Sequence, residues 1–240
     1  MSPQGIVIYG PPASGKNTIT AALTRLDPRF TLLPKLKVGT GRADGYEFVS
    51  AEHLDKLRQA GRLVAETHRY GNVYAIDRQT IEGRHAAGYV PVVHMGNIRD
   101  LRQLIGKVPD GWLRVLLWVP REVTEQRSRS RGDVDTGKRL AAWDETLTDL
   151  ETSIDAGFFH LRIHTDRRRA EAAAHEIRNA YDRLRHAIWF QAEARRLRDE
   201  LLPAPGSGPA ATRCRTVDNG HHQAEDSDGS TPPHGEDSQT

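Results

Sequence analysis

The sequence has very little cysteine and no long apolar run. Its one cysteine, Cys214, cannot form an internal disulfide, so we expect a reducing compartment, the cytoplasm. A membrane-spanning helix needs about 18 consecutive apolar residues, and neither such a run nor the apolar core of a signal peptide is present. Aromatic residues, 6% of the chain, do not alternate with basic ones as in nucleic-acid platforms. We therefore expect neither a membrane nor a nucleic acid as a partner.

Apolar residues are also scarce overall, and the shortage is concentrated at the C-terminal end. From Pro203 onward the chain consists mainly of Pro, Gly, Ser, His and acidic residues. Such a segment buries too little apolar surface to offset the entropy of ordering it. The sequence predicts one folded domain over residues 1–202 and a disordered low-complexity tail over residues 203–240. The domain holds 32 Lys and Arg against 26 Asp and Glu, a mild excess that suits phosphate ligands.

Residues 5–18 hold the most informative motif, an apolar stretch that runs into a glycine-bounded loop. Gly10, Gly15 and Lys16 have the spacing G-x-x-x-x-G-K of a phosphate-binding loop. Glycines let backbone N–H groups turn toward a polyphosphate, and the following helix presents its positive end. The loop residues predicted to bind the donor nucleotide are Gly10, Pro11, Pro12, Ala13, Ser14, Gly15, Lys16, Asn17 and Thr18. A glycine-rich turn without a ligand is the alternative.

The metal end of this loop is unusual. The residue after the lysine is ordinarily a Ser or Thr whose hydroxyl binds Mg²⁺, and here it is Asn17. An amide oxygen can ligate a hard cation, but it is uncharged and lies one atom farther along the side chain. We predict Asn17 as a weakened Mg²⁺ ligand.

Apolar stretches alternate with helical patterns along residues 1–202. Strands are predicted at residues 6–9, 31–38, 46–49, 63–67, 89–94, 113–119 and 159–163, and helices at residues 16–26, 51–60, 78–87, 98–105, 121–130, 138–156 and 167–201. Strands separated by helices pair in parallel through right-handed crossovers. The sequence thus predicts an α/β fold with a parallel core sheet flanked by helices and a long C-terminal helix. Short strands clustered around one helix indicate a small inserted lobe.

Three residues of that lobe have the chemistry to bind the phosphate of an acceptor. Arg42 lies in a glycine-rich turn, where its planar guanidinium could clamp a phosphate with two hydrogen bonds. Tyr46 and Tyr74, the latter in a turn over residues 70–74, could donate their hydroxyls to the same group. For Arg42 alone, a solvated turn arginine is the alternative.

A third group of basic residues follows a predicted helix. Arg127 and Arg131 lie four residues apart at the helix end, and Arg139 follows after a short polar turn. This pattern suits a lid that closes over a transferring phosphoryl group, whose transition state is stabilised mainly by positioning and by positive charge. A solvated basic helix is the alternative.

The order of these motifs resembles the guanylate kinase family over roughly residues 4–201. The resemblance rests on residues 10–16 (Gly-Pro-Pro-Ala-Ser-Gly-Lys), 46–50 (Tyr-Glu-Phe-Val-Ser) and 71–74 (Gly-Asn-Val-Tyr), with weaker matches at 131–132 and 138–140. It implies a P-loop nucleoside-monophosphate kinase fold with an acceptor lobe at about 38–76 and a lid at about 131–139. It also implies ATP and Mg²⁺ as cofactors, and a small phosphorylated acceptor as partner.

The resemblance assigns roles by position. Arg42, Tyr46 and Tyr74 match residues that hold the acceptor phosphate, and Arg131 and Arg139 match lid arginines. We predict Lys16, Arg42, Arg131 and Arg139 as the catalytic residues, with Lys16 stabilising the transferring group.

The family's guanine-reading residues are missing. Aligned through residues 71–72, these positions fall on Ala65, Ile76 and Gly96. Glu66 is one residue off and is predicted as a substrate ligand only with a register shift, because in a strand a one-residue slip normally points a side chain to the other face. His94 stands where the family ends a strand in acids, and it could contact substrate or cap the strand.

Three functions follow from the sequence. The first is ATP-dependent phosphorylation of a nucleoside 5′-monophosphate, with GMP as the family default and another or a modified nucleotide made credible by the missing guanine contacts. The second is a ribose 1,5-bisphosphate kinase, known from a related branch of the fold, which makes 5-phosphoribosyl diphosphate. The third is a binding module that has lost catalysis, which Asn17 favours and the intact Gly10 and Lys16 oppose.

Overall fold

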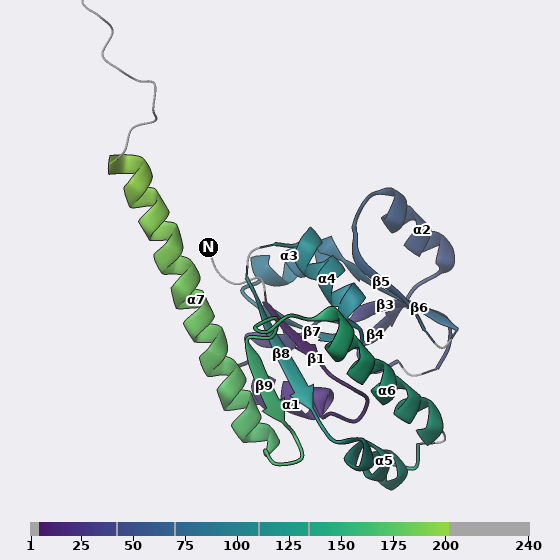
Figure 1. The fold of residues 1–240 in the computed structure, drawn as a ribbon. Coiled ribbons are helices and arrows are strands. Elements are labelled where there is room, and N and C mark those ends of the chain that lie inside the picture. Colours follow the sequence, from purple (N-terminus) through teal and green to yellow (C-terminus); the bar gives the residue numbers. More distant parts are fainter. Residues whose placement is uncertain (1–4, 42, 70, 110, 134, 202–240) are drawn as a thin grey trace, which may run out of the picture. The chain divides into compact units, whose positions relative to one another are not determined.

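A five-stranded sheet forms the centre of the computed structural model, which describes residues 5–41, 43–69, 71–109, 111–133 and 135–201 (Figure 1). The strand order is β2-β7-β1-β8-β9, and every neighbouring pair is parallel. The strands are β1 (Gly5–Tyr9), β2 (Phe30–Leu32), β7 (Val90–Met95), β8 (Trp112–Trp118) and β9 (Leu161–His164). The predicted α/β fold with a parallel core sheet is confirmed. The predicted tail lies outside the described residues.

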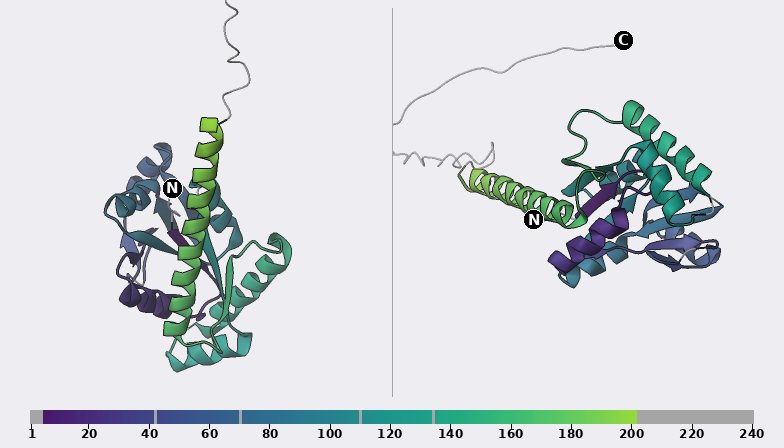
Figure 2. Two further views of the ribbon diagram at one scale, coloured as in Figure 1. Left: turned by 90° about the vertical axis from the view of Figure 1, so that its left-hand side faces the viewer. Right: turned by 90° about the horizontal axis from the view of Figure 1, so that it is seen from below.

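Helices cover both faces of this sheet, as Figure 2 shows from two further directions. Alternate residues of β1 point to opposite faces: Ile6 and Ile8 pack in one apolar cluster, and Val7 and Tyr9 in another. The first cluster includes α1 (Lys16–Leu26) and α7 (Ala170–Leu201), and the second includes α3 (Arg78–Ala86) and α4 (Ile98–Lys107). Because β1 is buried on both sides, the loop that follows it starts from a rigid position.

A second sheet of four strands forms the inserted lobe. Its order is β4-β3-β6-β5, with β3 (Lys35–Val38), β4 (Tyr46–Phe48), β5 (Leu63–Arg69) and β6 (Asn72–Asp77). Helix α2 (Ala51–Gln59) begins at Ser50, whose hydroxyl accepts a hydrogen bond from the His53 N–H at 3.1 Å. Leu54 and Leu57 of α2 pack on one face of the sheet. The other face is left to line a cavity.

Two predicted elements differ from the structure. Residues 31–38 do not form one strand: β2 pairs with β7 in the core sheet, whereas β3 pairs with β4 and β6 in the lobe. Pro34 lies between them, and because proline has no N–H it cannot continue a strand ladder. In addition, residues 72–77 form β6, the antiparallel partner of β3 and β5, where the sequence indicated only a turn.

The predicted lid, at about residues 131–139, begins after α5 (Arg121–Ser130) and extends into the first turn of α6 (Thr136–Ser153). Arg127 of α5 donates hydrogen bonds to the carbonyls of Ala13, at 3.0 Å, and Thr165, at 2.8 Å. This arginine therefore ties the end of α5 to the loop after β1 and to the loop after β9. In the part of the chain that the structure describes, no helix is long and apolar enough to cross a membrane.

Candidate active site

The loop between β1 and α1 requires its two glycines. A Cβ atom at Gly10 would lie 2.3 Å from the Leu117 carbonyl oxygen, so no larger residue fits beside β8. Gly15 is the N-cap of α1 and has φ +88°, in the left-handed region that favours glycine. The loop thus brings the chain into α1 with the helix N-terminus at the cavity.

Lys16 lies over this loop and binds the loop's own carbonyls. Its Nζ donates to the carbonyl oxygens of Gly10, at 2.7 Å, and Pro11, at 2.9 Å. The pKa of Lys16 is lowered to about 7, mainly by burial and in addition by the nearby charges of Lys35, Arg69 and Arg139. A polyphosphate in the loop would stabilise the ammonium form, because it would supply the negative charge that this cluster lacks.

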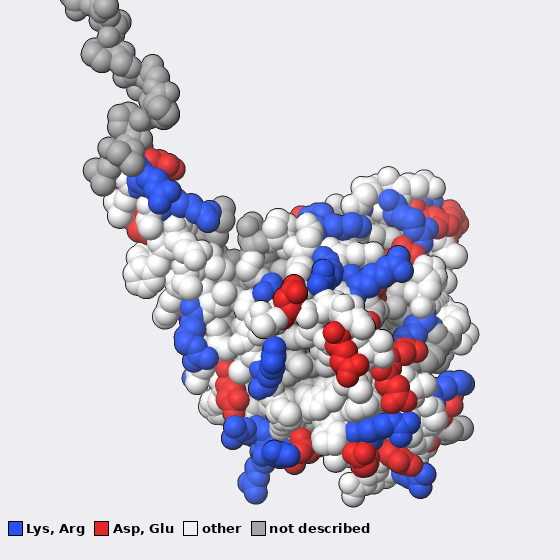
Figure 3. Space-filling view, in the orientation of Figure 1, with Lys and Arg blue, Asp and Glu red and all other residues white. Residues whose placement is uncertain are grey.

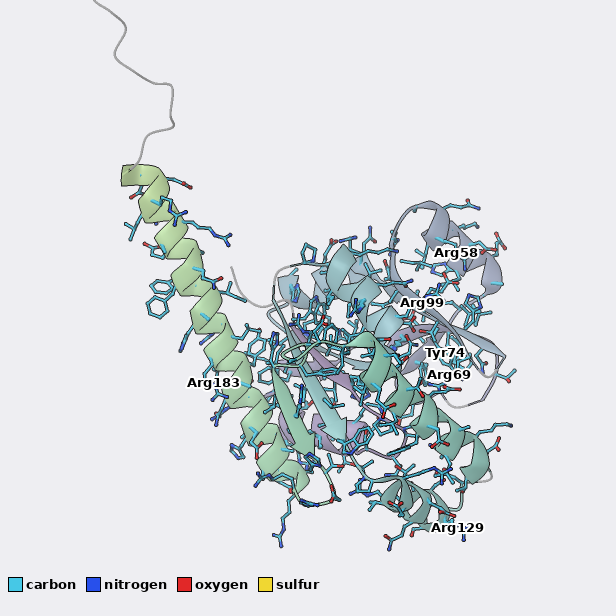
Figure 4. The ribbon with its side chains drawn as sticks, viewed as in Figure 1. Arg58, Arg69, Tyr74, Arg99, Arg129 and Arg183 are labelled. Carbon is cyan, nitrogen blue, oxygen red and sulfur yellow. The ribbon has the colours of Figure 1, made fainter. Side chains whose placement is uncertain are left out.

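A cavity of about 560 Å³ opens in front of Lys16. Its lining is shared between the loop, the second sheet, the end of β7 and α6: Gly10, Pro12, Lys16, Lys35, Tyr46, Thr67, Arg69, Tyr74, His94, Met95, Gly96, Asn97, Asp100, Asp135, Lys138 and Arg139. Figure 4 labels Arg69 and Tyr74 on the strands of the lobe, on the side toward α6, and Arg58 on α2. The cavity therefore joins the predicted donor loop to the predicted acceptor lobe.

Two tyrosines and a buried lysine form one cluster on the cavity side of the lobe. The rings of Tyr46 and Tyr74 lie 5.1 Å apart between centroids. The Lys37 Nζ lies 5.2 Å from the Tyr46 centroid and 5.7 Å from that of Tyr74, and the lysine is only 2% exposed. This cluster places one positive charge and two phenols where the sequence predicts the acceptor phosphate.

Beside this cluster, a polar network joins the lobe to α4. The buried Asp100 carboxylate accepts hydrogen bonds from the Thr67 hydroxyl and from the Asn97 side-chain amide, the latter at 2.7 Å. Asn97 also caps α4, because its side-chain oxygen accepts from the Asp100 N–H at 2.8 Å. All three residues line the cavity, so they offer hydrogen-bonding atoms to a ligand.

His94, on β7, also lines the cavity, and it is neutral. Burial lowers its pKa to about 3, with the charges of Lys16 and Lys35 acting in the same direction. Its Nε2 is 2.8 Å from the Thr20 hydroxyl. The ring is therefore held against α1, and it contributes no positive charge to the cavity.

Comparison with known proteins finds guanylate kinases among the relatives of this chain. The sequence is 31% identical over 170 residues to the guanylate kinase of Synechococcus sp. (strain CC9311), which covers 65% of this chain and 88% of the relative. It is 28% identical over 153 residues to the guanylate kinase of Xanthomonas axonopodis pv. citri (strain 306), with 60% and 75% covered. The chain belongs to the guanylate kinase family. No protein-family model matches the sequence.

A solved structure agrees in fold. The crystal structure of guanylate kinase from Anaplasma phagocytophilum superposes with a TM-score of 0.54 at 15% identity, covering 77% of this chain and 87% of that one. Family membership makes the protein a nucleotide-kinase-type phosphotransferase with a P-loop.

Of the positions aligned with the family's guanine-reading residues, Ala65 and Ile76 form a buried apolar pair behind the cavity lining, called the apolar floor below, and Gly96 has no side chain. Ala65 and Ile76 are direct cross-strand partners, 4% and 2% exposed, inside an apolar cluster. A Cβ at Gly96 would lie 3.3 Å from Nη1 of Arg69, so the arginine occupies the space that a longer side chain there would need. A guanine base therefore has no matching polar group at these three positions.

Glu66 does not replace the missing guanine reader. Its carboxylate accepts hydrogen bonds from Arg58 of α2, at 2.9 and 3.0 Å, and lies 2.9 Å from the His68 Nε2. The prediction of Glu66 as a substrate ligand is therefore corrected: Thr67 faces the cavity, and strand alternation turns Glu66 to the α2 face.

The predicted lid arginines lie in different places. Arg139 lines the cavity and is held by the carboxylate of Asp133, with N···O distances of 2.9 and 3.0 Å. Arg131 is exposed and lines a separate groove beside Arg127, outside the cavity. Arg42 lies outside the described residues, and its predicted role stays a prediction.

The metal end has few protein ligands. Asn17 is exposed in the first turn of α1 and borders a small cavity of about 110 Å³ together with Asp44 and His94. No group of three His, Cys, Asp or Glu side chains among the described residues could hold a metal ion. The donor set fits a Mg²⁺ ion that takes most of its ligands from phosphates and water, with the Asn17 amide as the protein ligand.

Sequence reasoning missed Lys35, Lys37 and Arg69. Strand alternation was the available signal: Lys35 and Lys37 are separated by the apolar Leu36, so both must lie on one face. This signal did not lead to a prediction, because residues 31–38 were expected to form one strand and the break at Pro34 was not predicted.

Charge on the surface is mixed. On the face drawn in Figure 3, basic and acidic side chains are interspersed over helices and strands. This pattern differs from the basic stripe typical of a nucleic-acid interface.

Proposed function

We propose that this protein transfers the γ-phosphoryl group of ATP to a phosphate group of a small acceptor. In this reaction the bond from the γ-phosphorus to the ADP oxygen breaks, and a bond to an acceptor phosphate oxygen forms. The observation that carries the proposal is the single cavity that joins Lys16 and its loop to Tyr46 and Tyr74.

The donor side follows from the geometry of the loop. Lys16 now donates to two loop carbonyls, and its ammonium can turn to the outer phosphates without a change of fold. Arg139 enters the same cavity from α6, so it can neutralise charge that develops during transfer. Arg131, by contrast, can act only if the segment between α5 and α6 moves toward the cavity.

Mg²⁺ would be held by the ATP phosphates and by Asn17, where it would neutralise charge on the transferring group. A test is Asn17→Ser, which restores the usual hydroxyl. We expect this variant to keep or raise activity and to need less Mg²⁺ for half-maximal rate.

The acceptor phosphate would bind to Tyr46, Tyr74 and Lys37, with Arg42 as a further predicted ligand. Family membership favours a nucleoside 5′-monophosphate, and GMP first. A phosphorylated sugar such as ribose 1,5-bisphosphate is the second candidate, because Ala65, Ile76 and Gly96 offer no polar group to guanine.

The proposal is tested by ADP release with ATP, Mg²⁺ and a panel of the common nucleoside 5′-monophosphates and ribose 1,5-bisphosphate. We expect turnover with at least one acceptor, and loss of it in Lys16→Met. If no acceptor is turned over and wild type and Lys16→Met share negligible ATP affinity, the protein is a binding module and the proposal is wrong.

A further inference from the structure

Lys35 is a cavity-lining cation with a very weak partner. Among the residues that the structure describes, the acceptor of its Nζ is the Met95 sulfur, at 3.7 Å. A thioether is a poor acceptor, and an ammonium has three donors to satisfy. Burial lowers the pKa of Lys35 to about 8, against which Asp100 acts to raise it. Such a group is stabilised when a ligand brings negative charge to it.

Lys35 lies beside the apolar floor, next to Ile76 on the neighbouring strand. In the antiparallel register of β3 and β6, Leu36 pairs with Ala75, which puts Lys35 level with Ile76. Ile76 in turn pairs with Ala65 on β5. On its other side Lys35 pairs with Tyr46 of β4, so Tyr46, Lys35, Ile76 and Ala65 form one cross-strand row, in which the lysine is the only charged side chain.

Arg69 stands over the third guanine-reading position. Its Nη1 lies 3.3 Å from the Cβ that a residue other than glycine would have at Gly96. Its Nη2 donates to Glu145 of α6 at 2.5 Å, and the Glu145 side chain is 68% exposed. Arg69 is only 25% exposed and lines the cavity. The guanidinium is thus held in place from the solvent side while it faces the ligand.

We propose that Lys35 and Arg69 bind a second anionic group of the acceptor, so that the acceptor is a small molecule with two separate anionic groups. This inference rests on the proposed function, which places the first phosphate of the acceptor at Tyr46 and Tyr74. Between the two anionic groups, the side chains of Thr67, Asn97 and Asp100 donate hydrogen bonds to hydroxyl groups of the acceptor or accept them from these groups. A phosphate or a carboxylate supplies the second charge.

Two matched pairs of acceptors isolate the second charge. Ribose 5-phosphate and ribose 1,5-bisphosphate differ by one phosphate, as do adenosine 5′-monophosphate and adenosine 3′,5′-bisphosphate. Binding is measured by calorimetry with the donor loop saturated by a non-hydrolysable ATP analogue. We expect the bisphosphate of at least one pair to bind at least about tenfold more tightly than the monophosphate. This is the effect of one charge-assisted hydrogen bond.

Three variants locate the effect. Lys35→Met and Arg69→Met should each reduce the preference for the second phosphate by about fivefold or more, and should change the affinity for the singly phosphorylated member much less. Arg99→Met is the matched control, an equal loss of charge at an exposed position of α4 that does not line the cavity. If Lys35→Met does not fold, Lys35→Gln replaces it.

Separate readouts distinguish this inference from the proposed function. Any of three results overturns the inference, even if ADP release shows a working kinase. These are equal affinity for the monophosphate and the bisphosphate in both pairs, tighter binding of GMP than of every bisphosphate, and a preference for the bisphosphate that persists in both Lys35→Met and Arg69→Met. A second-phosphate preference that Lys35→Met and Arg69→Met remove supports it, even if no acceptor is turned over and the proposed function fails.

Discussion

The donor end of the cavity is built from backbone, whereas the acceptor end is built from side chains. At the donor end, Gly10 and Gly15 shape a loop that lines the cavity with Gly10, Pro12 and the first helical residue, Lys16. At the acceptor end, the cavity is lined by the side chains of Lys35, Tyr46, Tyr74 and Arg69, all on strands of the second sheet.

This difference explains which parts of the family pattern this chain keeps. A backbone site changes only when its glycines change, and a Cβ at Gly10 would collide with the backbone of β8. A side-chain site changes one residue at a time, because a strand presents each residue separately. The donor end therefore keeps the family spacing of Gly10, Gly15 and Lys16. The acceptor end has Lys35 and Arg69 beside the positions where the family reads guanine.

Loss of the loop lysine should have the largest effect. Lys16→Met removes the charge that neutralises the transferring group, and we expect kcat to fall by about 10²-fold to 10³-fold. Stability should hold, because a poorly solvated charge is removed. ADP release and thermal unfolding measure the two effects, with Lys56→Met, an exposed lysine of α2, as control. A kcat within threefold of wild type would contradict the donor-end account.

The apolar floor should matter for stability. Ile76→Ser removes a 2% exposed side chain from an apolar cluster and buries a hydroxyl, so we expect unfolding free energy to fall by about 2–4 kcal/mol. Urea unfolding measures this loss, with Glu47→Ser on the exposed part of β4 as the control, expected within about 0.5 kcal/mol. A neutral Ile76→Ser would mean that position 76 faces a ligand site and is not core.

Glu66 should matter least. Because its carboxylate binds Arg58 on the α2 face, Glu66→Gln should change the acceptor KM less than twofold and cost at most about 1 kcal/mol of stability. Hydrogen bonding from Arg58 lowers the pKa of Glu66, so its small contribution is present near neutral pH and is lost as the pH falls through that lowered pKa. KM measurement and unfolding at pH 7 and pH 3 test this. A large rise in the acceptor KM would show that Glu66 contacts the acceptor, contrary to this account.

The sequence predicted the core sheet and the donor loop because both depend on local patterns. The spacing of Gly10, Gly15 and Lys16 fixes the loop, and helices 16–26 and 121–130 end at the predicted residues. The acceptor end depends on which strands pair, and pairing is not local. The break at Pro34 and strand β6 were not predicted from the sequence. For this reason the sequence could not show that Lys35 lies level with Ile76 or that Arg69 lies beside Gly96.

The central claim is that the loop after β1 binds the phosphates of a donor nucleotide through Lys16, and proton uptake tests it most directly. With the pKa of Lys16 lowered to about 7 in the free protein, the amine is mostly neutral at pH 8, and bound phosphates should protonate it. Calorimetric titration of Mg²⁺-ATP at pH 8, in buffers of different ionisation enthalpy, should show uptake of a large fraction of a proton in wild type. Uptake should be clearly smaller in Lys16→Met, where Lys35, with a pKa of about 8, can still take up part of a proton. Binding without proton uptake, or the same uptake in both proteins, would contradict the account.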